Sequence, residues 1–300
     1  MKTLPLARTW LRPAIGFWGL AITLGLMPGS VLAHDDHYDN SKAPHESPHT
    51  AEPPTGGHSS LAEAATNPIG NLIQLQLQDQ YNWDNYNSDG YSNSAIVQPV
   101  VPFKLPWESV PLVVTRTTLP FVSTPDLGDP VGREHGVGDL SIIAPFIPKL
   151  KAKGIMLGLG PALSIPTASK DTTGSGRWLA GPTAVYFNGR TKGWQWGMLG
   201  WHFWDFAGDD DRARVNKTFF QPFAVRHFDK GWYAGTPDVP GTYNWKDNKG
   251  TFPFGLRLGR VTKIGKQPVN LFGEVFGTPW DDGPSPKWTA KVSFTLLFPK

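Results

Sequence analysis

Apolar and polar residues alternate over residues 72–81, LIQLQLQDQY. Ile73, Leu75 and Leu77 fall on one parity, and the glutamines fall on the other. A period of two predicts a β-strand with one apolar and one polar face. In a soluble protein the apolar face would pack on a core, whereas in a membrane barrel it would face lipid and the glutamines would line the interior. This segment by itself leaves both arrangements open.

Segments of about ten residues with similar patterns recur along the chain, separated by residues that favour turns. The predicted strands are 71–81, 94–104, 110–122, 139–149, 154–165, 180–188, 194–206, 218–228, 231–242, 251–262, 267–277 and 287–298. Their connections alternate in length: the long TPDLGDPVGREHGV precedes the short KAKG, and the long AGDDDRARVN precedes the short DK. Outer-membrane barrels have short turns on one side of the membrane and long loops on the other. The pattern therefore predicts a single all-β, antiparallel transmembrane β-barrel over residues 67–300, with about 12 strands.

The face that meets lipid can be predicted from the composition of the two parities. In residues 288–298, WTAKVSFTLLF, apolar residues from Trp288 to Phe298 share one parity, and Lys291 lies on the other. In residues 251–262, phenylalanines and leucines oppose glycines and Arg257. A soluble core seldom receives glycines and charges, so we expect the apolar parity to face lipid.

The opposite parity supplies the candidate residues of the barrel interior. Arg116 joins them because a basic side chain facing the middle of the bilayer would cost roughly 2–4 kcal/mol. The predicted lumen-lining residues are Gln74, Gln76, Gln78, Gln98, Arg116, Arg257, Glu274 and Lys291. One interpretation is a narrow polar pore whose charges set selectivity; the other is a network of salt bridges that only holds the barrel shut. Twelve strands lie between filled barrels of about eight strands and open barrels of about 16.

Two features disagree with a regular barrel. Prolines fall inside predicted strands, where they cannot donate a ladder hydrogen bond, so we expect bulges or gaps there. They are Pro99, Pro120, Pro145, Pro161, Pro182 and Pro222. Residues 194–206, WQWGMLGWHFWDF, carry aromatic side chains on both parities, so the pattern does not assign their faces.

Residues 1–33 predict a secretory signal peptide. Basic residues precede a short apolar run at 14–27, and PGSVLA ends at Ala33, so we expect cleavage before His34. The run is shorter than the roughly 20 residues of a spanning helix. The signal holds three of the 28 Lys and Arg residues and none of the 25 Asp and Glu residues, so the rest of the chain is balanced in charge. This balance argues against nucleic acid as a partner.

Residues 34–66 differ in composition from the rest of the chain. The segment is rich in His, Pro, Ser and acidic residues, which bury too little apolar area to order a chain, and we expect it to be disordered and periplasmic. SLAEAAT, residues 60–66, has the composition of a short helix. The histidines are weak candidates for metal binding because their spacing matches no tight four-ligand motif. They are His34, His37, His45, His49 and His58.

Several ordered segments together resemble one known family. They are NPIGNLIQLQLQDQYNW, GVGDL, GLGPALSIPTA, GSGRWLAGPTAV, NKTFFQPF, GKQPVNL and the terminal VSFTLLFPK. They resemble outer-membrane proteins associated with the meta-pathway of phenol degradation, often labelled "transporter", over residues 67–300. The resemblance implies an outer-membrane β-barrel with a transport role and supplies no catalytic or ligand residues. The terminal aromatic residue typical of such barrels, Phe298, is followed here by Pro299 and Lys300.

The sequence offers little for catalysis. His202 and Asp205 lie three positions apart on one predicted strand, so they point to opposite faces and form no dyad. The acidic loop GDDDRARVN has the oxygen ligands of a Ca²⁺ site, but a solvated loop with internal ion pairs explains it as well. We expect no catalytic residues and no cofactor.

The function predicted from these patterns is passage of small solutes, with aromatic ones as candidates, through a bacterial outer-membrane channel. Its expected partners are outer-membrane lipid, a small-molecule solute and the barrel-assembly machinery. Two alternatives stay open: a structural or adhesion barrel that conducts nothing, and a secreted soluble β-sandwich that binds a ligand.

Overall fold

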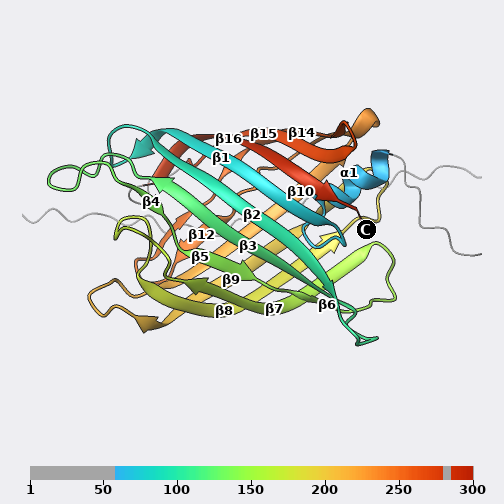
Figure 1. Ribbon diagram of the computed structural model, residues 1–300, viewed down its shortest axis with the longest axis horizontal. Coiled ribbons are helices and arrows are strands. Elements are labelled where there is room, and N and C mark those ends of the chain that lie inside the picture. Colours follow the sequence, from blue (N-terminus) through green and yellow to red (C-terminus); the bar gives the residue numbers. More distant parts are fainter. Residues whose placement is uncertain (1–57, 280–284, 300) are drawn as a thin grey trace, which may run out of the picture. The chain divides into compact units, whose positions relative to one another are not determined.

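The computed structural model describes residues 58–279 and 285–299, which fold as one short helix followed by strands (Figure 1). The helices are α1 (His58–Thr66) and the 3₁₀ turn η1 (Asp229–Gly231). The strands are β1 (Ile73–Tyr86), β2 (Ser92–Lys104), β3 (Leu112–Ser123), β4 (His135–Val137), β5 (Leu140–Ile143), β6 (Phe146–Ile147), β7 (Ile155–Ile165), β8 (Arg177–Asn188), β9 (Trp194–Gly208), β10 (Asn216–His227), β11 (Trp232–Gly235), β12 (Gly241–Asn244), β13 (Lys249–Thr251), β14 (Phe254–Ile264), β15 (Gln267–Gly277) and β16 (Ser285–Phe298).

The strands form one closed antiparallel barrel. Segments of one interrupted strand aside, each strand pairs with its neighbours in the chain, and β1 pairs with β16, so the ring closes between the first strand and the last. The segments β4, β5 and β6 form one interrupted barrel strand. The segments β11 and β12 form a second, and β13 and β14 form a third. The 16 segments therefore make 12 barrel strands. The predicted fold class is therefore confirmed for the described residues, and the β-sandwich alternative is wrong.

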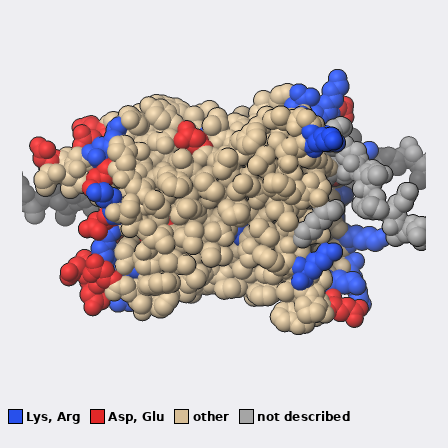
Figure 2. All heavy atoms as spheres, in the orientation of Figure 1, with Lys and Arg blue, Asp and Glu red and all other residues tan. Residues whose placement is uncertain are grey.

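The outward parity of the barrel is apolar. Leu77, Leu258 and Val292 are 42%, 56% and 59% exposed, whereas the residues beside them on the other parity are buried or partly buried. Figure 2 shows the charged side chains gathered at the two ends of this face, with a broad band almost free of charge between them. Such a band is the surface that a membrane barrel presents to lipid. One acidic residue departs from the pattern, because Asp79 of β1 is exposed on the same parity as Leu77.

Four of the six strand prolines are accommodated in three ways. The ladder between β2 and β3 omits the position of Pro99, which is a gap of the predicted kind. Pro161 and Pro182 lie opposite each other, so two residues without an N–H share one position. Pro145 lies between β5 and β6, where the strand is interrupted. The other two, Pro120 and Pro222, keep their places in the ladder.

The two ends of the barrel differ in their connections. We call the end with α1 and the last residues of β16 the turn end, and the opposite end the loop end. Turns such as 228–231 and 265–266 lie at the turn end, and the connections 124–134, 166–176 and 209–215 lie at the loop end. The first connection is shorter than predicted because β1 continues to Tyr86 and β2 begins at Ser92.

One side of the barrel interior is mainly apolar and the other is richer in polar side chains; we call them the apolar half and the polar half. The apolar half is carried by β3 to β10, with buried Val114, Ile143, Ile147, Ala162, Leu179, Val185, Phe187, Leu199, Phe203 and Phe223. The polar half is carried mainly by β14, β15, β16, β1 and β2, with buried Gln74, Gln78, Asn82, Gln98, Arg257, Asn270, Glu274, Thr289, Lys291, Ser293 and Thr295. Both sides are mixed, because β7 to β10 also bury Ser164, Arg177, Thr183, Gln195, Gln221 and His227, and β11 to β16 also bury Tyr233, Val261, Phe272 and Leu297.

Helix α1 packs inside the turn end of the barrel. Ala62 and Ala65 are buried against inward side chains that include Val225, Val261 and Leu297. The expectation of disorder is therefore wrong for the last part of residues 34–66. The physical reason is that the two alanines fit an apolar surface that only the closed barrel provides.

The segments that precede α1 carry predictions of their own. The predicted signal peptide, residues 1–33, and the rest of the His-rich segment, residues 34–57, lie outside the described residues. No helix in the described part of the chain is long and apolar enough to cross a membrane.

Candidate functional site in the barrel interior

The glutamines of β1 form a hydrogen-bonded row inside the barrel. Gln78 Nε2 donates to Gln76 Oε1 (2.8 Å), and Gln76 Nε2 donates to Gln74 Oε1 (3.3 Å). Gln78 also donates to Gln98 Oε1 on β2 at 2.9 Å. Because successive inward residues of a strand are neighbours on one face, the alternation of the sequence places these amides in contact. The row gives the polar half of the interior a continuous surface of donors and acceptors.

Three charged residues lie side by side across β14, β15 and β16. Arg257 is the Cα partner of Glu274, which in turn is the Cα partner of Lys291. Lys291 Nζ lies 2.9 Å from Glu274 Oε1, and neither side chain is exposed. Opposite charges directly across a strand pair stabilise a sheet, and burial makes the pairing obligatory.

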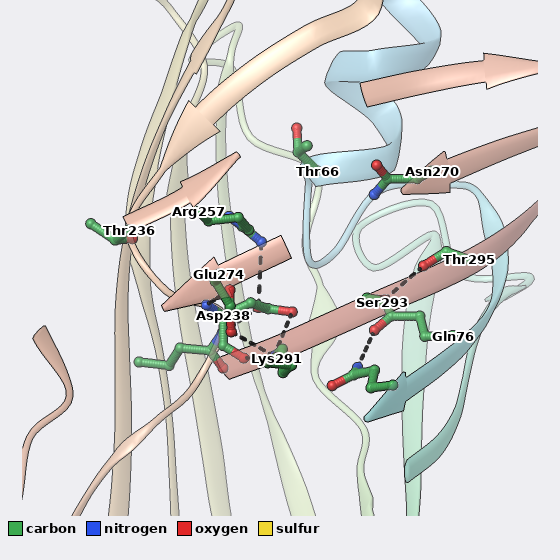
Figure 3. Close-up of polar contacts among 12 residues, drawn as sticks. Thr66, Gln76, Thr236, Asp238, Arg257, Asn270, Glu274, Lys291, Ser293 and Thr295 are labelled. Carbon is green, nitrogen blue, oxygen red and sulfur yellow. Dashed lines mark hydrogen bonds and ion pairs between the residues drawn. The ribbon is translucent and has the colours of Figure 1, made fainter. Parts of the chain in front are cut away.

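A short segment between β11 and β12 leaves the barrel wall and inserts a further carboxylate. This segment, residues 236–240 (TPDVP), places Asp238 against the charged row (Figure 3). Lys291 Nζ donates to the Asp238 carbonyl (2.7 Å), and the Asp238 N–H donates to Glu274 Oε2 (2.9 Å). Arg257 Nη1 lies 3.9 Å from Asp238 Oδ1. The two prolines of the segment explain the insertion, because neither can donate to a neighbouring strand.

The apolar half contributes two polar side chains to the same place. Gln221 of β10 donates from Nε2 to Asp238 Oδ1 at 2.6 Å. Arg116 of β3 donates from Nη1 to Gln221 Oε1 at 3.4 Å. We call Arg116, Asp238, Arg257, Glu274 and Lys291 the charged constriction; its three cations and two carboxylates leave one net positive charge.

Helix α1 is tied to the barrel wall on the turn-end side of the constriction. Thr66 Oγ1 lies 2.7 Å from Gln195 Oε1 and 3.1 Å from His227 Nε2. Gln195 Nε2 also donates to the Glu63 carbonyl at 2.9 Å. These contacts hold the last turn of the helix across part of the turn end.

Cavities of different size mark the space that the interior leaves. One of about 50 Å³ lies between Thr66 and the constriction and is lined by Gln76, Arg116 and Asp238 among others. Another, of about 240 Å³, lies beside α1 against β8 and β9. A cleft of about 490 Å³ opens at the loop end. The smallest has room for only a few water molecules, so the interior is nearly filled at the constriction.

Two larger hollows lie on the outward face. One of about 820 Å³ is lined by Leu77, Leu258, Val292 and neighbouring residues of the apolar parity. Small outward residues such as Gly273 form its floor. It belongs to the surface that faces lipid, so it is no part of a path through the barrel.

The eight residues predicted to line the lumen all lie on the inward parity. Six of them are buried, and the other two, Gln76 and Arg116, are partly exposed inside the barrel. The structure brings the four charged ones into the charged constriction and the four glutamines into the amide row. Their contact with a passing solute stays a prediction. The sequence did not indicate Asp238, because residues 231–242 were predicted as one uninterrupted strand; the two prolines that flank it were the available signal.

The other candidate residues are the histidines of the N-terminal segment and the acidic loop. His34, His37, His45 and His49 lie outside the described residues, and His58 begins α1. Within residues 58–279 and 285–299, no group of three or more His, Asp, Glu or Cys side chains is arranged to hold a metal ion. The acidic loop instead bonds within itself, with the Asp211 N–H donating to an Asp209 carboxylate oxygen (3.2 Å).

One serine–histidine pair was not apparent from the sequence. Ser123 Oγ and His135 Nδ1 are hydrogen-bonded at 2.7 Å near the loop end. A nucleophilic serine needs a base whose other ring nitrogen is held by a third group. Among the described residues, no such partner of the His135 ring is found.

His202 and Asp205 point to opposite faces, as predicted. Asp205 is buried inside the barrel against Arg177, at 3.4 Å. The His202 ring is hydrogen-bonded to Thr218 on the other parity at 2.7 Å. The two side chains therefore form no dyad.

Comparison with solved structures finds barrels of the same type. An outer membrane channel of Pseudomonas putida F1 matches with a TM-score of 0.58 and 19% identity, covering 78% of this chain and 97% of its own. The NanC porin matches with a TM-score of 0.46 and 10% identity, over 76% of this chain and 100% of the porin. Outer membrane phospholipase A from Escherichia coli matches with a TM-score of 0.42 and 12% identity, over 81% and 98%. The first of these shows the shared fold.

Comparison of the sequence with curated proteins finds no match. A family model described as "Putative MetA-pathway of phenol degradation" matches residues 73–270, which is most of the barrel. The chain belongs to this phenol-degradation family.

Proposed function

We propose that the chain is an outer-membrane channel through which small aromatic solutes pass. The observation that carries the proposal is the unequal lining of the interior, which is more apolar on β3 to β10 and more polar on β14 to β16, β1 and β2. An aromatic ring with a polar substituent can contact the apolar half with its ring and the polar half with its substituent. The family's link to phenol degradation and the fold shared with a bacterial channel support the same proposal.

The proposed orientation places the turn end in the periplasm and the loop end outside the cell. It follows from the predicted signal peptide at residues 1–33 and from the short turns at the end where α1 and the last residues of β16 lie. The apolar outward band then contacts lipid, and assembly requires the barrel-assembly machinery. No catalytic step and no cofactor are part of this function.

Passage requires movement at the constriction, because the cavity there is only about 50 Å³. The inserted segment 236–240 and helix α1 are the parts that leave the wall, and side-chain contacts hold part of each. These two segments then set the open fraction of the channel. A barrel in which they never move is the structural alternative.

Single-channel conductance of the refolded mature chain in a planar bilayer tests the proposal. We expect discrete steps, and we expect Arg116→Gln to lower the permeability ratio of chloride to potassium. Arg260→Gln is the matched control, because Arg260 is exposed on the outward parity over Trp232. A correctly folded barrel without any conductance, with folding checked by heat-modifiable migration on gels, would contradict the proposal and support the structural alternative.

A further inference from the structure

Four inward side chains form a continuous stack of two cations and two rings. Lys217 Nζ lies 5.3 Å from the centroid of the Phe219 ring. Phe219 and Trp201 are parallel within 4° with their centroids 5.0 Å apart. Arg116 Cζ lies 6.0 Å from the centroid of Trp201. We call these four residues the cation–aromatic stack.

The two cations of the stack line two different hollows. Lys217 lines the loop-end cleft of about 490 Å³, and Arg116 lines the cavity of about 50 Å³ at the charged constriction. Phe219 and Trp201 are partly exposed between them and are Cα partners on β10 and β9. The stack therefore follows the direction that a solute takes from the loop end to the constriction.

Both cations of the stack lack an ion-pair partner. Among the described residues, no Asp or Glu lies within ion-pair distance of Lys217 or Arg116. The basic residues near Lys217 differ, since Arg214 pairs with Asp205 (2.6 Å) and Arg212 with Asp171 (3.4 Å).

Arg116 is linked to the carboxylate of Asp238 through a neutral side chain. Its guanidinium donates to the neutral Gln221, and the Gln98 amide lies beside it. The carboxylate of the constriction, Asp238, accepts from Gln221 and lies near Arg257 and Lys291. Each end of the stack thus presents positive charge beside an aromatic ring.

We propose that the cation–aromatic stack binds and passes on aromatic solutes with a single negative charge, such as benzoate-type carboxylates. This inference rests on the proposed channel function and narrows its solute class. The carboxylate contacts Lys217 first and Arg116 next, while the ring packs on Phe219 and Trp201. An anion without a ring gains only the charge contact, a neutral phenol gains only the ring contact, and a cationic ring is repelled by the two cations.

Block of the chloride current by added solute tests this selectivity. The full mature chain is reconstituted in a planar bilayer, and sodium benzoate, sodium acetate, phenol or benzylammonium chloride is added at the loop-end side. We expect half-block by benzoate at a concentration about tenfold below that of acetate. Tenfold corresponds to about 1.4 kcal/mol, which lies within the range that an aromatic contact contributes. Equal half-block by benzoate and acetate, or stronger block by benzylammonium, would overturn the inference.

Substitutions in the stack separate ring contact from charge contact. Trp201→Leu should raise the half-blocking concentration of benzoate about tenfold and leave acetate unchanged, and Trp201→Phe should restore most of the benzoate block. Lys217→Gln should weaken block by both anions. Trp196→Leu is the matched control because Trp196 is 46% exposed on the outward parity of the same strand. Wild-type block by benzoate after Trp201→Leu would contradict the assignment.

If the folded barrel does not conduct, equilibrium binding still tests the cation–aromatic stack. Isothermal titration of the folded chain in detergent with sodium benzoate measures the site directly. Binding that is lost in Trp201→Leu and kept in Trp196→Leu would support the stack while the proposed channel function fails. Conductance without any preference for benzoate would support the channel and overturn the stack.

Discussion

At the scale of single residues, the interior is organised by burial of charge. Lys291 and Glu274 are fully buried and form one ion pair, with Arg257 and Asp238 beside them. Removing one partner of such a pair leaves a charge without compensation in a site from which water is largely excluded. The pair therefore specifies how β15 and β16 align, whatever its net contribution to stability.

The first prediction concerns this pair. Lys291→Met should lower the free energy of unfolding by about 3–5 kcal/mol, because Glu274 stays buried without its cation. The double variant Lys291→Met/Glu274→Gln should recover a large part of that loss. Urea unfolding in lipid vesicles, followed by tryptophan fluorescence, measures both.

An exposed pair on the same strand provides the control. Lys287 and Asp84 lie 3.0 Å apart and are roughly half exposed, so water and salt screen their attraction. Lys287→Met should therefore change the free energy of unfolding little. An equal loss for Lys287→Met and Lys291→Met would contradict the role assigned to burial.

Sequence patterns predicted residue placement well wherever one parity was strongly polar. The glutamines of β1 and the charges at 257, 274 and 291 needed only a period of two. Trp201 and Phe219 were not predicted, because aromatic side chains occur on both parities of β9 and the faces could not be separated. Asp79 is the reverse case, since it shares the outward parity with leucines and is held by a hydrogen bond from Asn93 (2.8 Å).

At the scale of elements, the sequence pattern predicts the positions of the strands closely, but it does not predict where strands are interrupted or where α1 lies. All 12 predicted strands overlap observed ones, although three of them are interrupted. The prolines at 237 and 240 were a local signal of the interruption, but the buried ion network that holds Asp238 comes from other strands, which no local pattern contains. Helix α1 likewise requires an apolar surface made by residues far away in the chain, so its composition indicated a short helix but not its position.

The second prediction tests α1 as an obstruction of the turn end. Ala62→Asp places a carboxylate against Val225, Val261 and Leu297 and should release the helix, so single-channel conductance should rise. Ala64→Asp is the matched control because Ala64 is partly exposed and lines the cavity of about 240 Å³, where a carboxylate can be hydrated. Its conductance should change little. Unchanged conductance in both folded variants would show that α1 does not limit passage.

At the scale of the whole molecule, two chemically different surfaces lie on the two sides of one sheet. The outward surface is apolar between its charged ends, and the inward surface carries the buried charges (Figures 2 and 3). A slip of one residue in any strand would exchange them, so the bilayer itself enforces the register. Cross-links are not needed for this, and the chain has no cysteine.

The third prediction tests which face of the sheet contacts lipid and which faces the interior. Leu77→Arg should reduce the yield of folded barrel in lipid vesicles, because a basic side chain on the lipid face costs roughly 2–4 kcal/mol. Gln80→Arg, on the inward parity of the same strand, should fold with nearly the yield of the unchanged chain. Folding yield is measured by heat-modifiable migration on gels, and equal yields for the two variants would refute the assignment of faces.

The pairing of β1 with β16 also has a consequence during synthesis. Those two strands are the first and the last of the barrel to leave the ribosome, and each supplies an edge that only the other can satisfy. A chain cut short anywhere before β16 keeps two unsatisfied edges and no closed ring, whatever else it has formed. Such a shortened chain cannot close the ring, and its free strand edges are available for pairing with another chain.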